Sequence, residues 1–488
     1  MPRRMSRIAS LWLIITGGVV VRALLPLSAW LASHDLAVYR SPDSASYIEP
    51  ARELLRHGRF QTAAGPELVR TPAYPLFLVL GVATGRVELV TIALQVALGA
   101  LSIYLVFRIA SAVFDGARAP LLAAALYAAE PLSIVYTSKI LSETVFTTLV
   151  LLFVACWVEN FRRPSWRAIT LAAMALAAAV YVRPVAYFLP IVATAMLAVR
   201  FALDRGRCWR QFLQIALFAG LSMGLVGLWQ LRNWTLAGYA RFSAVEDVNL
   251  YYYQYATVLA RQQGRPFEEV RADLGFGDPQ RYLSRHPRER TWTQAERYRA
   301  MRAEAWQSIR AKPAAHLAVY VGGLARSLAD PGAAEYFRLF RRYPANGGLL
   351  THALDRGFWN AVDRMRRLRP GLFWTNVMLG VALVCCFALA VLSLARRNGQ
   401  HGAALISVVL VALYFVMLSG GPVGLSRFRH PVMPLVCVLA GSGLESVLQR
   451  LRGAEREERA TAADLRNSNK TRVHCRTAGL KPAARLYC

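Results

Sequence analysis

Long apolar runs alternate with short polar connections along this chain of 488 residues. About ten of the runs approach the ~20 residues that a helix needs to cross a bilayer. They cover residues 8–30, 88–107, 121–136, 144–158, 168–182, 185–199, 212–229, 371–394, 403–419 and 431–448. The short arginine-rich connections all fall on the cytoplasmic side if both chain ends lie there. The pattern therefore predicts an all-α polytopic membrane protein with about ten transmembrane helices.

Two polar segments fall on the outer side in this arrangement. In the first outer loop, residues 44–56 have an amphipathic pattern in which Tyr47, Ala51 and Leu54 share one face, as in a helix lying on the membrane surface. The second segment contains a helical pattern at 292–311. We therefore expect four parts: residues 1–231, a transmembrane catalytic module with the first outer loop 31–87; 232–370, an extracytoplasmic helical domain; 371–449, the last transmembrane helices; and 450–488, a disordered basic cytoplasmic tail.

The composition changes this picture little. The net charge of +29 does not indicate a nucleic-acid partner, because the basic residues cluster at the ends of the apolar runs, as in a membrane protein. The seven cysteines have no metal-binding spacing, and Cys385 and Cys386 are adjacent within an apolar run. Cysteine is therefore interpreted as packing material. Arg22 interrupts the first run and is expected to face the bundle or extend to the membrane surface.

Charged residues gather at the level of the outer membrane surface. For a single arginine, a place at the membrane boundary is the better explanation, and an aspartate that precedes a helix is often only an N-cap. Two carboxylates accompanied by several arginines are harder to explain in that way. A carboxylate can take a proton from a hydroxyl group, and guanidinium groups can bind a phosphate through two hydrogen bonds. The set predicts group transfer from a lipid phosphate, and it comprises Asp43, Arg70, Lys139, Glu143, Arg183, Arg232, Arg427 and Arg429.

Several motifs, spread in order over residues 8–448, carry a family resemblance. They are PDSASYIEPARELL, RTPAYPLF, LSETVF, VRPVAYFLP, RNWTLAGYARFSAVEDVNL and SRFRHPVMP. In this order the chain resembles the GT-C superfamily of polyprenyl-phosphate-dependent membrane glycosyltransferases. The resemblance is to the bacterial branch similar to dolichyl-phosphate-mannose protein mannosyltransferases and aminoarabinose transferases. The motifs are specific for the superfamily and not for a substrate.

The resemblance implies an inverting transfer of a hexose or pentose from a polyprenyl-phosphate sugar donor to a hydroxyl group of a glycan, lipid or protein acceptor. The reaction is expected at the extracytoplasmic face of the bacterial inner (plasma) membrane. Asp43 is the expected general base, and Glu143 is expected to position the acceptor or a metal. No cofactor is certain and a divalent metal is possible, with no ligands assigned. The expected substrate-binding residues are Tyr47, Arg70, Tyr74, Lys139, Arg183, Arg232, Asn249, Arg427 and Arg429.

Some features leave alternatives open. Asp43 has no acidic neighbour, unlike the eukaryotic protein mannosyltransferases, so a protein acceptor is in doubt. Glu130 is either a third functional acid or a boundary residue before Pro131. The tyrosines at 251, 252, 253 and 255 stack on a sugar or, more commonly, line the membrane interface. A transporter or flippase of an anionic lipid or sugar is the rival function. It predicts paired halves and broken helices, and the sequence shows neither. An inactive scaffold is a third interpretation.

Overall fold

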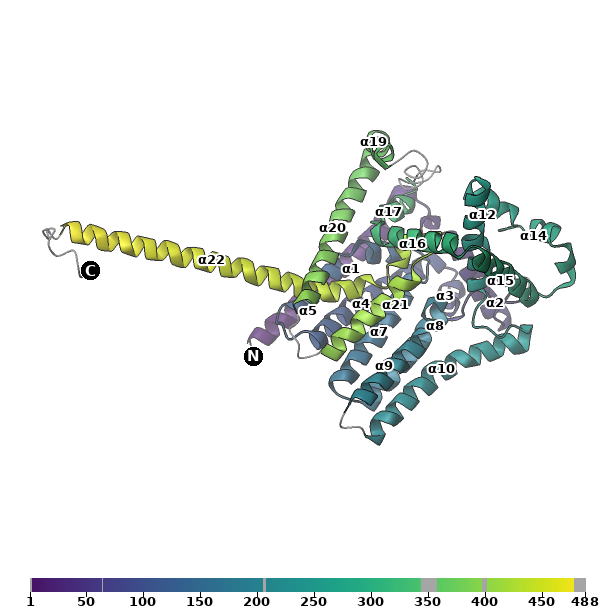
Figure 1. Cartoon of the computed structure of the whole chain (residues 1–488), viewed down its shortest axis with the longest axis horizontal. Helices are drawn as coiled ribbons and strands as arrows, with labels where there is room; N and C mark the ends of the chain where they lie inside the picture. The colour runs from purple at the N-terminus through teal and green to yellow at the C-terminus, as the bar shows by residue number, and fades with distance from the viewer. Residues whose placement is uncertain (1, 64, 205–207, 344–357, 397–401, 478–488) are drawn as a thin grey trace.

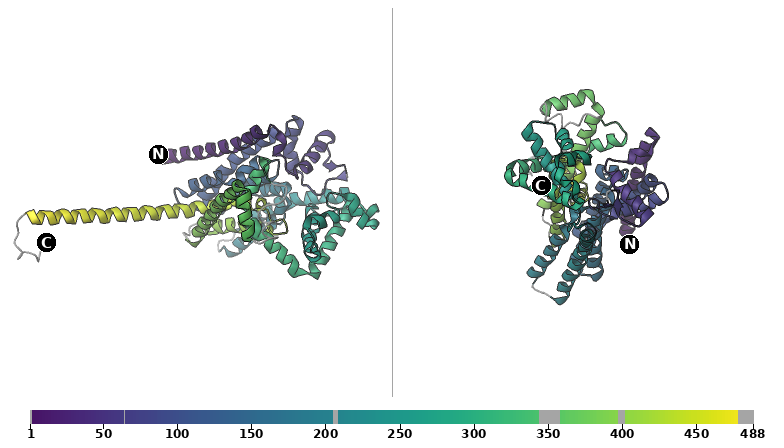
Figure 2. Two further views of the ribbon diagram at one scale, coloured as in Figure 1. Left: turned by 90° about the horizontal axis from the view of Figure 1, so that it is seen from above. Right: turned by 90° about the vertical axis from the view of Figure 1, so that its right-hand side faces the viewer.

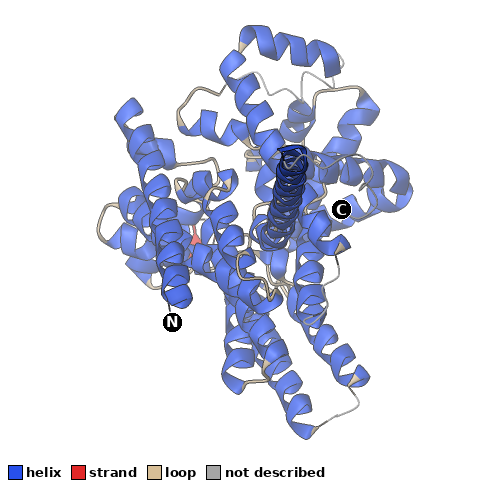
Figure 3. Ribbon diagram, turned by 90° about the vertical axis from the view of Figure 1, so that its left-hand side faces the viewer, coloured by secondary structure: helices blue, strands red, loops and turns tan. Residues whose placement is uncertain are grey.

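The structure is a computed structural model that describes residues 2–63, 65–204, 208–343, 358–396 and 402–477. The described chain is helical except for turns and one pair of short antiparallel strands, β1 (Gln61–Thr62) and β2 (Gly65–Pro66). Figure 3 shows this small pair beside the helices. The all-α membrane fold predicted from the apolar runs is confirmed.

Six helical segments are long and apolar enough to cross a membrane. They are α1 (Pro2–Ser33), α4 (Val87–Val113), α7 (Glu143–Arg162), α9 (Leu189–Leu203) with the preceding turn η2 (Pro184–Ala186), α10 (Trp209–Ala237) and α20 (Pro370–Ala395). Shorter apolar helices are α3 (Ala73–Ala83), α8 (Trp166–Val182) and α21 (Gly402–Leu418). Helix α7 packs between α4 and α8, and α8 packs on α10, as the parallel ribbons of Figure 1 show. The main apolar core lies between these helices.

The third expected span is broken, which corrects the expectation of unbroken helices. Helices α5 (Ala119–Ala128) and α6 (Pro131–Thr137) meet at an angle of 51°. Glu130 lies at the junction, and its carboxylate accepts hydrogen bonds from the N–H groups of Leu132 (3.2 Å) and Ser133 (2.5 Å). Pro131 is the first residue of α6, a position where proline is well tolerated. Glu130 therefore acts as an N-cap, which supports its interpretation as a boundary residue.

Arg22 of α1 stabilises the break between α5 and α6. The side chain is fully buried, and it donates to the carbonyl oxygens of Ala128 (2.8 Å) and Tyr127 (3.2 Å). The last carbonyl groups of a helix have no partner within it. Arg22 thus satisfies the end of α5 and faces the bundle, one of the two positions expected for it.

The first outer loop forms η1 (Leu36–Tyr39) and α2 (Ser44–His57), so the predicted amphipathic helix is present. Its buried face includes Tyr47 and Ala51, and it ends at Gly58, whose φ of 65° suits glycine. The hydroxyl of Ser44 donates to the carbonyl of Ile140 (2.7 Å). The start of α2 is therefore fixed to the connection between α6 and α7.

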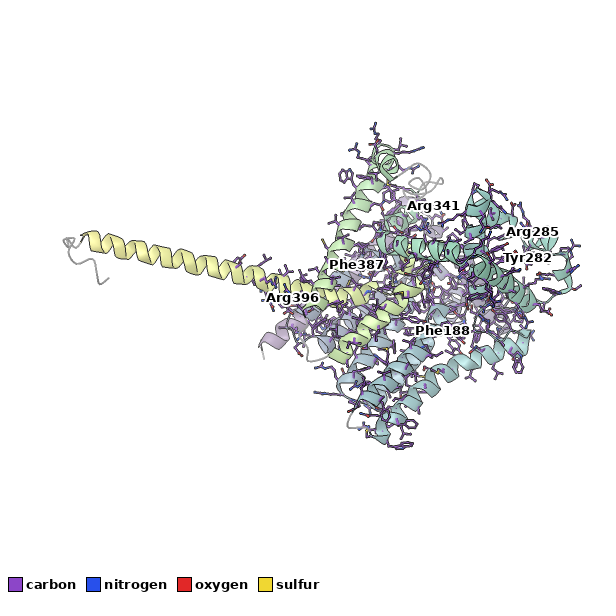
Figure 4. All side chains as sticks on the ribbon, viewed as in Figure 1. Phe188, Tyr282, Arg285, Arg341, Phe387 and Arg396 are labelled. Atoms are coloured by element: carbon purple, nitrogen blue, oxygen red, sulfur yellow. The ribbon has the colours of Figure 1, made fainter. Side chains whose placement is uncertain are left out.

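The segment after α10 is also helical, as expected. It contains α11 (Val245–Asn249), the π-helix η3 (Leu250–Tyr255), α12 (Ala256–Gln263), α13 (Phe267–Asp273), α14 (Pro279–Arg285), η4 (Pro287–Thr291), α15 (Gln294–Ala311), α16 (Pro313–Ala329), α17 (Ala333–Leu339) and α19 (Phe358–Leu368). Helix α15 matches the pattern at 292–311, and Thr293 and Glu296 form its capping box. Helices α12 to α15 form a lobe at one end of the molecule, where Figure 4 labels Tyr282 and Arg285.

The last helix, α22 (Met433–Thr477), extends farther than expected. Residues 450–477 continue it, whereas the sequence predicts a disordered tail there. This stretch is rich in alanine, arginine and glutamate, which are good helix formers. Figure 2 shows α22 projecting at the same end as the N-terminus, opposite the lobe.

Candidate active site

Asp43 directly precedes α2, but its side chain makes no capping hydrogen bond. Its Oδ1 accepts from Nη2 of Arg70 (3.0 Å) and its Oδ2 from Nη1 of Arg427 (2.9 Å). Burial raises the pKa of Asp43, but the charges of Arg427 and Arg70 outweigh it, so the pKa lies below its ordinary value. The N-cap explanation of this residue therefore lacks the hydrogen bond that it requires.

Glu143 is the first residue of α7 and is buried. Its Oε1 lies 2.7 Å from Nη1 of Arg183 and 3.1 Å from Nε of Arg427. Both are ion-pair distances, and neither contact is a hydrogen bond. Arg183 comes from the corner between α8 and η2, and the N-terminus of α7 itself favours a negative charge. Arg427 thus bridges the two predicted acids, Nη1 to one and Nε to the other.

Arg70 is held by the first outer loop. Its Nε donates to the hydroxyl of Ser46 (2.9 Å) and its Nη1 to that of Tyr47 (3.1 Å). Its guanidinium also lies over the Tyr47 ring, 4.4 Å from the centroid, which is a cation–π contact. Helix α2 and the residue before it therefore supply the carboxylate of Asp43 and the side chains that aim Arg70 at it.

Tyr74 supports this arrangement from α3. Its ring meets that of Tyr47 edge to face at 5.0 Å, and its hydroxyl donates to Oε1 of Gln95 (3.2 Å). The amide of Gln95 donates in turn to the carbonyls of Lys139 (2.7 Å) and Thr137 (3.1 Å). Gln95 was not predicted, although a buried glutamine inside an apolar run is a visible signal for such a role.

Arg427 lies in a short turn, η5 (Ser426–Phe428), that α16 and the residues after it hold in place. The N–H of Ser426 donates to Oδ2 of Asp330 (3.1 Å). Nη1 of Arg429 donates to the carbonyls of Ser327 and Leu328, each at 2.8 Å. Arg429 therefore fixes the turn to the end of α16, whereas Arg427 reaches the acids. Asp330 was missed because its partner lies 96 residues away.

The remaining predicted residues have other surroundings. Lys139 is buried and forms an ion pair with Glu335 of α17. Arg232 donates to the carbonyls of Glu67 (2.9 Å) and Phe60 (2.6 Å), which ties α10 to the first outer loop. Asn249 is exposed at the end of α11. The structure thus brings Asp43, Tyr47, Arg70, Glu143, Arg183 and Arg427 together and places Lys139, Arg232, Asn249 and Arg429 elsewhere. The catalytic and binding roles of all these residues stay predictions.

The four tyrosines of the π-helix region divide into two groups. Tyr251 and Tyr252 are buried in the core of the lobe. Tyr253 and Tyr255 are partly buried. Burial raises the pKa of Tyr253 and Arg271 opposes the rise, while the negative charge of Asp43 adds to it. The stacking of Tyr253 on a sugar stays a prediction.

The charges of this group suit an anion. Two carboxylates, Asp43 and Glu143, stand among three guanidinium groups, Arg70, Arg183 and Arg427. Over the described part of the chain, no three His, Cys, Asp or Glu side chains gather as a metal site. Each carboxylate is already compensated by two arginines, so the donor set does not fit a divalent cation. A phosphate fits, because it is bound by guanidinium groups.

Comparison with solved structures finds this fold in a known oligosaccharyltransferase. The chain is similar to AglB, the oligosaccharyltransferase of Archaeoglobus fulgidus, in a complex with an inhibitory peptide and a dolichol-phosphate (TM-score 0.52, 14% identity, 94% of this chain and 52% of that chain covered). The apo form of the same oligosaccharyltransferase matches with a TM-score of 0.52 at 14% identity, covering 93% of this chain and 52% of the other. ArnT from Cupriavidus metallidurans, bound to undecaprenyl phosphate, is more distant (TM-score 0.35, 16% identity, 90% and 79% covered).

The chain spans about half the length of the AglB chains that it matches. No family model matches the chain, and no curated protein sequence matches it either. At 14% identity the likeness shows the fold, and the chemistry has to be argued from the residues of the site.

Proposed function

We propose that the chain is an integral-membrane glycosyltransferase that moves a sugar from a polyprenyl-phosphate donor to an acceptor hydroxyl. The observation that carries this proposal is the bridge of Arg427 between Asp43 (2.9 Å) and Glu143 (3.1 Å). It brings a candidate base, a second acid and phosphate-binding groups to one place, from segments up to 384 residues apart. The fold shared with AglB, whose structure contains a dolichol-phosphate, supports a lipid-phosphate donor.

The donor phosphate binds to the guanidinium groups of Arg427 and Arg70, with Arg183 behind them. Without donor, these groups point at the carboxylates of Asp43 and Glu143. A phosphate accepts hydrogen bonds from guanidinium groups more strongly than a single carboxylate oxygen does, because it offers several charged oxygens. Donor binding therefore draws the arginines away from Asp43.

Asp43 then acts as the general base. The acceptor hydroxyl gives its proton to the carboxylate while its oxygen forms the new bond to the anomeric carbon of the sugar. The bond from that carbon to the phosphate oxygen breaks, and its electron pair leaves with the polyprenyl phosphate on the arginines. Loss of the arginine contacts raises the pKa of Asp43 toward the range that suits a base. Attack from the face opposite the phosphate inverts the anomeric centre.

Glu143 has the supporting role in this scheme. It is buried and ion-paired with Arg183, so it fixes the arginines between cycles and accepts a hydrogen bond from the bound substrate. The acceptor is a glycan, lipid or protein hydroxyl, and the sugar is a hexose or a pentose. The site belongs to the extracytoplasmic face of the bacterial inner membrane. The N-terminus and the projecting α22 at the opposite end of the molecule from the lobe support this assignment.

A transporter or flippase is less well supported. Its alternating-access folds use broken helices in corresponding positions of two halves. Among the described helix pairs that are together long and apolar enough to cross a membrane, the α5–α6 pair is the one bent by more than 40° at a short break. The break is closed by Glu130 and Arg22, which cap the two helix ends.

The test is a reconstituted reaction of the full chain. Undecaprenyl phosphate carrying radiolabelled mannose, glucose or arabinose is supplied together with bacterial envelope lipids and glycans. We expect the label to leave one lipid donor and to appear in a larger product, with free undecaprenyl phosphate released. Donors that remain intact under all conditions, or that cross a vesicle membrane unchanged, would reject the proposal.

A further inference from the structure

Buried polar atoms without partners lie next to the Arg427 bridge. Within the described part of the chain, the hydroxyl of Tyr136, Nε2 of His430 and Oε2 of Glu143 make no hydrogen bond. The three residues are at most 2% exposed. Buried polar groups are nearly always hydrogen-bonded, so several unpaired ones in one place point to a bound group.

These atoms belong to one side-chain cluster. The rings of Tyr136 and His430 are in edge-to-face contact at 5.1 Å, and Nζ of Lys139 lies 6.0 Å from the centroid of Tyr136. Thr147, whose hydroxyl bonds to Nδ1 of His430 (2.9 Å), lies one turn after Glu143 on α7, and Lys139 is ion-paired with Glu335. We call the five residues Tyr136, Lys139, Glu143, Glu335 and His430 the Tyr136 cluster.

The cluster needs hydrogen bonds rather than charge. Glu143 is compensated by Arg183 and Arg427, and Lys139 is paired with Glu335. His430 bonds through Nδ1 to the hydroxyl of Thr147 (2.9 Å). What stays free is one hydroxyl group, one ring nitrogen and one carboxylate oxygen, which together can donate and accept. A neutral group that carries several hydroxyls matches this set, whereas an ion would meet charges that are already balanced.

We propose that the Tyr136 cluster binds the sugar ring of the donor as a neutral, polyhydroxylated group. This rests on the proposed function, in which Arg427 and Arg70 hold the donor phosphate. The sugar is joined to that phosphate through a single oxygen atom, so its site has to adjoin the arginines. Glu143 belongs to the cluster and also contacts Arg427, which gives the required continuity.

Tyr136→Phe separates a ligand site from a structural role. The change deletes an oxygen that has no partner among the described residues, so a purely structural account predicts unchanged or slightly higher stability. The matched control is Ser393→Ala, because the Ser393 hydroxyl is also buried and unpaired. Ser393 lies near the far end of α20, close to Arg396, which Figure 4 labels on the side of the projecting α22.

Equilibrium binding to the full chain in lipid nanodiscs is the test. The probes are undecaprenyl phosphate alone and undecaprenyl phosphate carrying mannose, glucose, galactose or arabinose. We expect the parent to bind at least one glycosylated lipid more tightly than the bare lipid. Tyr136→Phe should reduce that advantage by about 2- to 10-fold, the worth of one hydrogen bond, with the same affinity for bare undecaprenyl phosphate and the same unfolding temperature. Ser393→Ala should bind every probe like the parent.

Each other outcome is decisive. If Tyr136→Phe binds all five lipids like the parent, ordered water fills the cluster and the inference is wrong. The same holds if the parent binds glycosylated lipids no better than the bare lipid, a result that leaves the proposed function standing. If the parent does not bind undecaprenyl phosphate at all, both the inference and the proposed function are wrong.

Discussion

Replacing Arg427 tests how one side chain serves two acids. Its Nη1 lies 2.9 Å from Asp43, and its Nε lies 3.1 Å from Glu143. Alanine removes both contacts and leaves Glu143, which is buried, with Arg183 alone. Lysine restores one positive charge, but its single nitrogen cannot take the places of two separate guanidinium nitrogens.

The magnitudes follow from burial and geometry. Removing one partner of a buried ion pair typically costs about 3–5 kcal/mol, and Glu143 keeps one of its two arginines. We therefore expect Arg427→Ala to lose about 3 kcal/mol of stability, the lower end of that range. A lost charge-assisted contact to the donor phosphate costs about 1.5–3 kcal/mol, which is about 10- to 100-fold in donor affinity. Lysine should recover less than half of that free energy.

The assay measures undecaprenyl-phosphate binding and the rate of sugar transfer at equal amounts of folded protein. Arg241→Ala is the matched control, because Arg241 forms an exposed ion pair with Glu246 (3.1 Å), a kind worth at most about 1 kcal/mol. If Arg427→Lys binds donor and transfers sugar like the parent, the bridge has no special role. If Arg427→Ala does so as well, Arg427 is only a membrane-edge residue.

Three further predictions concern the acid limb, the buried pair and the topology. Because the pKa of Asp43 is lowered by Arg427 and Arg70 against the effect of burial, the ion-pair stabilisation is complete above the ordinary aspartate pKa and is lost as the pH falls through the lowered value. On the acid side, kcat/KM should therefore fall at a lower pH than kcat, because donor binding frees Asp43 from the arginines. Arg70→Ala should raise the pH at which kcat/KM falls. If both parameters fall at the same pH and Arg70→Ala does not change it, the result would argue against this. Lys139→Met should destabilise the protein by about 3 kcal/mol, the lower end of the same range, because the buried Glu335 loses its ion pair with Lys139 and keeps only that with Arg338 (2.6 Å); thermal unfolding that matches the parent would show that the pair with Lys139 is dispensable. A cysteine at position 163, in a connection that the parity places inside, should resist an impermeant thiol reagent in intact cells, and rapid labelling there would invert the topology.

The parts of the fold that depend on local patterns could be predicted from the sequence. The spacing of Tyr47, Ala51 and Leu54 defines α2, and the structure confirms it. The break at Glu130 was missed because a 16-residue run at 121–136 is apolar on both sides of it. The carbonyl of Ala128 at the end of α5 is satisfied by a tertiary contact, the hydrogen bond from Arg22, 106 residues away. Hydrophobicity along the chain carries no information about such a partner.

The candidate site shows the same limit. Arg427 and Arg429 are indistinguishable in the sequence, yet two residues that are two positions apart at a tight 3₁₀ turn point to different sides. Arg427 meets the acids, whereas Arg429 meets the carbonyls of α16. Lys139 was grouped with the phosphate ligands by its level in the membrane, and its partner Glu335 lies 196 residues away. Membrane topology predicts the depth at which a residue lies in the membrane, but the direction of its side chain depends on the packing of distant helices.

The central claim is that Asp43 accepts the proton of the acceptor, and Asp43→Asn tests it most directly. Asparagine keeps the size of the side chain, and its amide oxygen can still accept a hydrogen bond from Arg70 or Arg427, so a purely structural role predicts some loss of stability but almost no loss of turnover per folded molecule. A general base cannot tolerate the change, because an amide does not accept a proton at neutral pH. Transfer from the undecaprenyl-phosphate sugar should fall by ~10²–10⁴-fold while membrane abundance and binding of undecaprenyl phosphate are retained. Turnover close to that of the parent at equal abundance would contradict the account and remove Asp43 from the mechanism.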